Sequence, residues 1–305
     1  MIILNPSYDL VFKYLMENAK IAKKIISVTL DTEIESMELL PQETSLKIHE
    51  EDAKIVRSLR MDFIAKIKTA SGDINTVMIE LQKVGDPNPI VRFRKYLGRT
   101  YMKHETREII KADKTYNEYF AYPIVTIYFL GYNLHGVDSP VVRVNPSVFD
   151  VTKNVTMDVR NEFIDQLNHR SHIIQLKRLR KDRITRIEKL LSLFDQSKTV
   201  DGNDMMLDVK DIDDEFRDVA DYLHLPVNDE KFIREMEYYE EVENSFSQKR
   251  AEINEMKIEL IEKEKTIEDN KKSLEEKDKS LEEKDKEIEE KDRYIQELLK
   301  QINKP

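Results

Sequence analysis

After Pro226 the chain contains no glycine, and its next proline is the last residue, Pro305. Over the same stretch an apolar residue recurs at every seventh position. The members of this repeat are Phe232, Tyr239, Phe246, Ile253, Leu260, Ile267, Leu274, Leu281, Ile288, Ile295 and Ile302. A heptad frame without helix breakers predicts one continuous helix. We therefore expect residues 229–305 to form a long charged helix or a weak coiled coil.

The residues at the second core position of each heptad do not decide whether this helix pairs with another helix or stands alone. This position is filled mostly by lysine, at Lys263, Asn270, Lys277, Lys284 and Lys291. Only one side of the seam is therefore apolar, which weakens a coiled coil. Pairs four residues apart, such as Glu282 and Lys286, would instead stabilise an isolated helix. A homodimer through the C-terminal helix and a solitary charged helix both fit this pattern.

Composition narrows the classes of protein. The formal net charge of −10 argues against a protein that coats nucleic acid non-specifically, because neutralising phosphates requires a basic surface. The absence of cysteine excludes disulfides, thiolate metal sites and cysteine nucleophiles, and fits a cytoplasmic location. No apolar run approaches the roughly 20 residues of a membrane span. The start, MIILNPSYDL, lacks the basic region of a secretory signal. We expect a cytoplasmic protein with no membrane partner.

Helical and strand patterns alternate over the first half of the chain. The predicted elements are one or two helices within residues 5–30, a hairpin of strands at 59–69 and 77–81, a helix within 90–112 and a buried strand within 122–134. Helices interleaved with antiparallel and buried strands indicate a mixed α/β core. We place this core at residues 1–150.

A basic stretch follows the predicted core. Residues 161–195 have a helical texture, and we expect residues 151–228 to form a helical extension with a basic helix. The candidate DNA contacts in it are Arg170, Lys177, Arg178, Arg180, Lys181 and Arg183. These cations suit phosphate groups. The alternative is that they form the solvated surface of a helix.

Two carboxylates in the predicted hairpin are candidate metal ligands. Strand side chains alternate, so Glu80 and Gln82 share one face and Lys83 points to the other. If Asp62 on the neighbouring strand has the same facing, the two carboxylates could hold Mg²⁺ or Mn²⁺. The alternative is a solvated sheet face. Glu80 ends an apolar run, however, where a carboxylate is costly without a partner.

Four segments in this order resemble the PD-(D/E)XK nuclease family transposases, which are related to the recombination-promoting nucleases. The segments are NPSYDLVFKYLM (5–16), RMDFIAKIKTASGDINTVMIELQK (60–83), RFRKYLGRTY (92–101) and YFAYPIVTIYFLGYNL (119–134). The resemblance extends to about residue 195. It implies a restriction-endonuclease-like mixed sheet flanked by helices. It also implies a Mg²⁺-dependent endodeoxyribonuclease.

The resemblance also implies roles for single residues. Asp62 and Glu80 match the two acidic metal ligands of the family, and Asp9 matches the acidic residue of its opening helix. Gln82 falls where the wider superfamily has a catalytic lysine, and this branch commonly has glutamine there. Glutamine offers only a neutral hydrogen bond to the developing charge, which is worth less than a cation.

A cation from elsewhere could replace that lysine. Lys13, one turn after Asp9, and Lys66, on the Asp62 face of its strand, are the two candidates. An ion pair or a helix cap is the alternative role for Asp9 and Lys13. Arg92 and Tyr96 resemble a family pair in which the arginine contacts DNA. The alternative is a structural arginine packed on a tyrosine.

Three hypotheses of function follow. The leading one is a metal-dependent DNA endonuclease associated with mobile elements or recombination. The second is a catalytically inactive nuclease-fold module that binds DNA or a protein. The third is a scaffold whose working part is the heptad segment.

Overall fold

The computed structural model describes residues 1–40, 63–83, 89–111, 114–159 and 161–302. Its contacts divide the chain into two units, Met1–Val242 and Glu243–Pro305. The first unit holds every strand in the described ranges, and the second consists of the continuation of α8 (Glu230–Ile302). The predicted α/β class and the long C-terminal helix are both confirmed.

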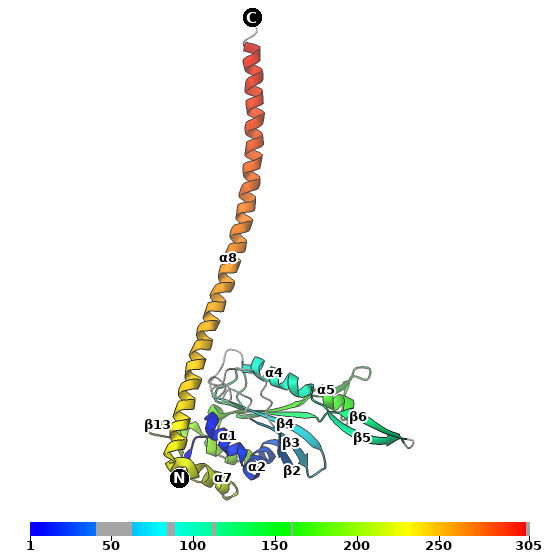
Figure 1. Ribbon diagram of the computed structural model, residues 1–305, viewed down its shortest axis with the longest axis vertical. Coiled ribbons are helices and arrows are strands. Elements are labelled where there is room, and N and C mark those ends of the chain that lie inside the picture. The colour runs from blue at the N-terminus through cyan, green and yellow to red at the C-terminus, as the bar shows by residue number, and fades with distance from the viewer. Residues whose placement is uncertain (41–62, 84–88, 112–113, 160, 303–305) are drawn as a thin grey trace. The chain divides into compact units, whose positions relative to one another are not determined.

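A six-stranded mixed sheet forms the centre of the first unit (Figure 1). Its order is β2 (Ile34–Leu39), β3 (Phe63–Thr69), β4 (Ile74–Gln82), β7 (Ile124–Leu130), β11 (Arg170–Gln175) and β8 (Val141–Val144). The strands β4, β7 and β11 are mutually parallel, whereas β2, β3 and β8 run antiparallel to their neighbours. The carboxyl ends of β4 and β7 therefore meet at one edge of the sheet.

The predicted hairpin is confirmed over its described residues, as β3 and β4. Phe63 pairs with Ile79 and Lys66 with Thr76. The turn between the strands contains Gly72 at φ +91°, a conformation that residues with a Cβ rarely adopt. The beginning of the first predicted strand, residues 59–62, lies outside the described residues.

Helices cover both faces of this sheet. The helices α1 (Asp9–Glu17) and α2 (Ala19–Leu30) pack on one face, where the Phe12 and Phe129 rings lie 5.3 Å apart. The helix α4 (Pro89–Tyr101) packs on the other, with Phe93 4.5 Å from Tyr128. Alternation along each strand thus divides the buried side chains into two clusters, the α1–α2 face and the α4 face.

A smaller sheet joins the beginning of the chain to residues near 200. It consists of β1 (Ile2–Leu4), β13 (Asn203–Asp208) and β12 (Thr199–Val200). Next to it, the fully buried Asn5 exchanges two hydrogen bonds with Gln196, at 2.9 and 3.0 Å. The Asn-Pro-Ser motif therefore fixes this junction, and α1 itself begins four residues later, at Asp9.

The prediction of a helical block at residues 161–195 is wrong in its central part. The segment forms α5 (Glu162–Leu167), β11, the 3₁₀ turns η1 (Leu176–Arg178) and η2 (Ser192–Phe194), and α6 (Arg186–Leu191). The strand forms because β7 and β8 offer hydrogen-bonding edges on both sides of it, and tertiary pairing outweighs local propensity. The sheet core therefore includes residues beyond 150.

The remaining described elements are short. They are the hairpin of β5 (Glu105–Lys111) and β6 (Lys114–Phe120), the hairpin of β9 (Val148–Asp150) and β10 (Val155–Met157), η3 (Gln196–Lys198), η4 (Asp214–Phe216), α7 (Arg217–His224) and η5 (Leu225–Asn228). None of the helices in the described ranges combines the length and the apolarity needed to cross a membrane.

The heptad helix is continuous, as its sequence predicts. Its first turns belong to the first unit, where Met236 is buried and the Phe232 ring lies 5.4 Å from that of Tyr14. In the second unit the apolar seam is uncovered, since its members from Ile253 to Ile295 are 49–66% exposed. The homodimer and the solitary helix both remain predictions.

Candidate functional site

Glu80 is a buried carboxylate near the carboxyl end of β4. Its side chain is on the same face as those of Met78 and Tyr128, because Glu80 pairs with Tyr128 on the parallel strand β7. Only 3% of the residue is exposed. The sequence of β4 produces this burial, since both faces of the strand are covered by helices and five of its nine residues are apolar. Glu80 therefore lies within the apolar layer beneath α4.

The negative charge of Glu80 affects the pKa of the neighbouring Tyr128. Burial of Tyr128 raises the pKa of its hydroxyl; a hydrogen bond with Thr126 opposes this effect, and the negative charge of Glu80 adds to it. Tyr128 is therefore a neutral phenol at any physiological pH. It can donate a hydrogen bond close to Glu80 without ionising.

Gly131 allows the ends of β4 and β7 to approach each other closely. Its N–H donates a 2.7 Å hydrogen bond to the carbonyl oxygen of Gln82. A Cβ at this position would lie 2.2 Å from the carbonyl oxygen of Lys83, which is closer than any real Cβ contact. Glycine at residue 131 thus sets the position of the Glu80–Gln82 segment.

Gln82 and Lys83 point to opposite faces, in agreement with strand alternation. The hydroxyl of Tyr132 donates to Oε1 of Gln82 at 3.4 Å. The Nζ of Lys83 instead lies 2.6 Å from a carboxylate oxygen of Glu240 and 3.3 Å from the centre of the Tyr8 ring. Lys83 is therefore held by α8 and by the residue that precedes α1. It is not available on the Glu80 face.

The predicted residues Asp9 and Lys13 belong to α1, a helix that packs on the sheet face opposite to that of Glu80. The buried side of α1 packs in the cluster on the α1–α2 face, whereas Glu80 points to the α4 face. Asp9 and Lys13 are both half-buried, and the contact of Tyr8 with Lys83 puts the start of α1 near the carboxyl end of β4. Asp9 therefore lies near the same end of the sheet as Glu80. The two residues belong to different elements, Asp9 to α1 and Glu80 to β4.

Lys66 lies in the middle of β3. Its Nζ lies 2.9 and 3.0 Å from the two carboxylate oxygens of Glu105, and 4.3 Å from the centre of the Tyr122 ring. Its strand partner is Thr76, four residues before Glu80 and so about 13 Å away along the strand. The hypothesis that Lys66 replaces the missing catalytic lysine loses its support.

The structure does not describe the side chains of two predicted site residues. Asp62 lies outside the described residues, and the same is true of the Arg92 side chain, although α4 includes its backbone. Tyr96 packs against the apolar cluster under α4, which favours its structural role. Among the residues that the structure does describe, no group of three or more His, Asp or Glu side chains is placed to hold a metal ion.

The exposed face of α4 is a basic surface that the sequence reasoning missed, apart from Arg92. Arg94, Lys95 and Arg99 on the helix and Lys103 just after it are all exposed. No acidic residue occurs between Pro87 and His104. That absence is the signal in the sequence that marks this surface, although the stretch after Arg170 contains more cations. We call these four residues the α4 basic face.

Three of the six predicted DNA-contacting residues between Arg170 and Arg183 are in ion pairs. Arg178 lies 3.0 Å from Asp138, Arg180 lies 2.6 Å from Glu188, and Arg183 pairs with Asp195. Such pairing lowers the net positive charge that a phosphate would meet. Arg170, Lys177 and Lys181 remain exposed.

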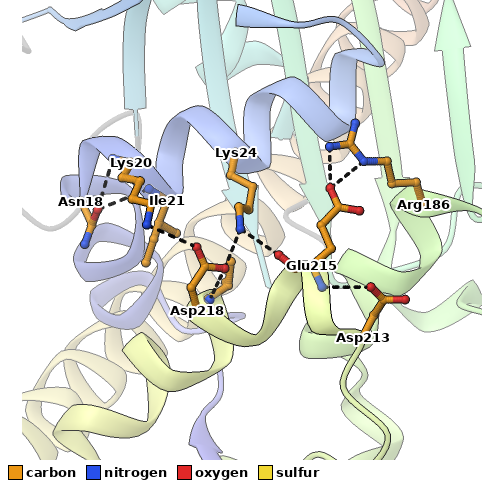
Figure 2. Close-up of polar contacts among 9 residues, drawn as sticks. Asn18, Lys20, Ile21, Lys24, Arg186, Asp213, Glu215 and Asp218 are labelled. Carbon is orange, nitrogen blue, oxygen red and sulfur yellow. Dashed lines mark hydrogen bonds and ion pairs between the residues drawn. The ribbon is translucent and has the colours of Figure 1, made fainter.

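The same pattern continues along α6, where ion pairs join helical segments (Figure 2). Arg186 donates to Glu215 at 2.8 Å, and Lys24 of α2 lies 2.6 Å from Asp218 of α7. These contacts join α6 to η4 and α2 to α7. The basic stretch is therefore in large part a structural element of the fold.

Comparison of the chain with protein-family models, with curated proteins and with solved structures finds no match in any of the three.

Proposed function

We propose that the chain is a metal-dependent DNA endonuclease that hydrolyses phosphodiester bonds and acts in the movement of mobile elements or in recombination. The observation that carries the proposal is Glu80, a carboxylate that is 3% exposed at the carboxyl end of a central parallel strand. So buried a position is a strongly perturbing environment for an ionisable group such as a carboxylate. Active sites favour such positions.

We propose Asp62 and Glu80 as the ligands of Mg²⁺ or Mn²⁺, and Asp9 as a third acidic candidate. Carboxylate oxygens are the donors that these hard cations prefer, so Glu80 fits the role. A bound metal of this kind would supply an acidified water and would stabilise the charge that develops on the phosphate. Gln82 and the hydroxyl of Tyr132, which donates to it, would place polar groups beside the metal.

The α4 basic face supports DNA as the substrate. Four exposed cations lie on or directly after the helix that covers Glu80, in a protein of net charge −10. Backbone phosphates are bound by such clusters of lysine and arginine, with an affinity that depends strongly on salt. DNA docked along α4 would come close to the face of the sheet that carries Glu80.

The decisive experiment is cleavage of supercoiled plasmid by the full-length protein, with and without Mg²⁺. Wild type should cut only with the metal, and Glu80→Gln should reduce the rate at least about a hundredfold while circular dichroism shows an intact fold. Glu105→Gln, which changes an exposed carboxylate at the start of β5, outside the β3–β4 hairpin, is the matched control. Equal cutting by Glu80→Gln and wild type would refute the proposal.

The alternative is a nuclease-fold module that binds DNA or protein without cutting. Gln82 is the observation that favours it, because no cation stands at that position. Calorimetric titration with Mn²⁺ separates the two functions. Metal binding that is lost in Glu80→Gln supports the endonuclease, whereas DNA binding without metal binding or cleavage supports the module.

A further inference from the structure

A basic hollow lies between α6 and the segment that follows β13. Its volume is about 460 Å³. Five cationic side chains line it, namely Lys181, Arg183, Lys189, Lys198 and Lys210. Three carboxylates, those of Asp195, Asp211 and Asp213, also line it, so the lining carries a net charge of +2, from five positive and three negative groups. In a chain of net charge −10, this local excess of positive charge is unusual.

Two of the three carboxylates are already engaged by protein donors. Asp195 pairs with Arg183 through Oδ2, and its Oδ1 accepts hydrogen bonds from the backbone N–H and the hydroxyl of Ser197, at 3.1 and 2.7 Å. Asp213 lies 2.9 Å from Lys189 and accepts a hydrogen bond from the backbone of Glu215 at 3.1 Å. Lys210 lies 3.6 Å from Asp208, which is not part of the lining. Lys181 and Lys198 are therefore the lining lysines that make no ion pair with the residues the structure describes.

Arg183, which lines the hollow, has one terminal N–H group that is not engaged by Asp195. Its side chain is 15% exposed, and Asp195 engages Nη2. The other terminal nitrogen, Nη1, is buried and has no hydrogen-bond acceptor among the residues that the structure describes. A buried donor without an acceptor is costly. An oxyanion bound beside Arg183 in the hollow would supply the acceptor.

The hollow is on the side of the sheet away from Glu80. The segment that contains α6 and η2 packs on the α1–α2 face, where the rings of Phe194 and Phe129 stack at 5.4 Å. Glu80 points to the α4 face. A ligand in the hollow would therefore not be the phosphodiester at the proposed cleavage site.

We propose that this hollow binds the phosphate group of a compact anion. Its volume is within the range of small-ligand pockets, about 300–1,000 Å³. Lysine binds phosphate as a point charge, and arginine adds directed N–H donors. The phosphate could belong to a small phosphorylated molecule or to the terminal phosphate of a nucleic acid, and both present the same doubly charged group.

Calorimetric titration of the full-length protein with inorganic pyrophosphate at physiological ionic strength tests the site. Wild type should bind pyrophosphate, and the double variant Lys181→Met/Lys198→Met should bind it about tenfold more weakly or worse. Lys20→Met/Lys153→Met is the matched control, because these lysines are 82% and 78% exposed and lie outside the hollow. The control should keep the wild-type affinity.

Two results would overturn the proposal. One is the absence of pyrophosphate binding to wild type, and the other is an equal loss of affinity in the test and control variants, which would indicate a diffuse charge effect. A second arm compares an oligonucleotide with and without a 5′-phosphate. A preference for the phosphorylated form that disappears in Lys181→Met/Lys198→Met identifies a nucleic-acid end as the source, and its absence identifies a small phosphorylated molecule.

Discussion

Replacing Glu188 with glutamine should destabilise the protein at neutral pH and have progressively less effect as the pH falls. Glu188 is buried at 2% exposure. Burial opposes its ionisation, but hydrogen bonds from the Thr185 backbone and from Arg180 outweigh that effect and lower the pKa of the carboxyl from 4.5 to about 2. The ionised form is therefore the one that the fold prefers.

The size of the effect follows from proton linkage. A pKa of about 2 in the fold, against 4.5 in the unfolded chain, corresponds to roughly 3 kcal/mol of stability. Because the Arg180 side chain is 56% exposed, water screens its charge, and we expect about 2 kcal/mol. This contribution is fully present above pH 4.5 and is lost as the pH falls toward 2.

Urea unfolding of wild type and Glu188→Gln, measured at intervals from pH 7 to pH 3, checks the reasoning. The difference in unfolding free energy should be largest above pH 5 and should shrink below pH 4. Glutamine also places an amide where Thr185 donates two hydrogen bonds, which adds a cost that does not vary with pH. A difference that stays constant over the whole range would refute the assignment of a lowered pKa to Glu188.

Three further predictions concern packing and protonation. Gly131→Ala should lower the unfolding free energy by about 2 kcal/mol or more in urea titrations, because its Cβ would overlap the Lys83 carbonyl. The matched change Gly98→Ala, in an exposed helical position with open space around it, should instead raise the free energy by about 0.5–1 kcal/mol. Burial of His172, assisted by Arg143 and Arg170, lowers the pKa of its imidazole from 6.5 to about 4, so the fold holds the neutral form. Wild type should therefore lose about 2 kcal/mol between pH 7.5 and pH 5, and His172→Gln should lose less over the same range.

Local sequence patterns correctly predicted the elements that are determined by neighbouring residues along the chain. The long helix follows from a stretch without glycine or proline, and the β3–β4 hairpin follows from alternation on either side of a Ser-Gly-Asp turn. Both signals act through neighbouring residues along the chain. These two predictions therefore do not depend on how the rest of the chain folds.

The strand β11 could not be predicted in the same way. Residues 170–175 carry Arg170 and His172, which favour neither a strand nor burial, and the segment is extended because β7 and β8 lie on either side of it. The burial of Glu80 was anticipated from the apolar residues around it. The placement of Glu80 relative to Asp9 depends on which helix covers which face of the sheet. The spacing of residues along the sequence does not contain that information.

The small sheet at the beginning of the chain has a consequence for synthesis. Ile2 pairs with Asp208, and Asn5 bonds with Gln196, so residues 2–5 are synthesised well before their partners, which lie about 200 positions later in the chain. At about 5–20 residues per second this delay lasts roughly 10 to 40 seconds. Contacts so distant along the chain also slow folding. Ile3 and Leu4, which are fully buried in the finished protein, remain exposed throughout that interval and are where a chaperone would be most needed.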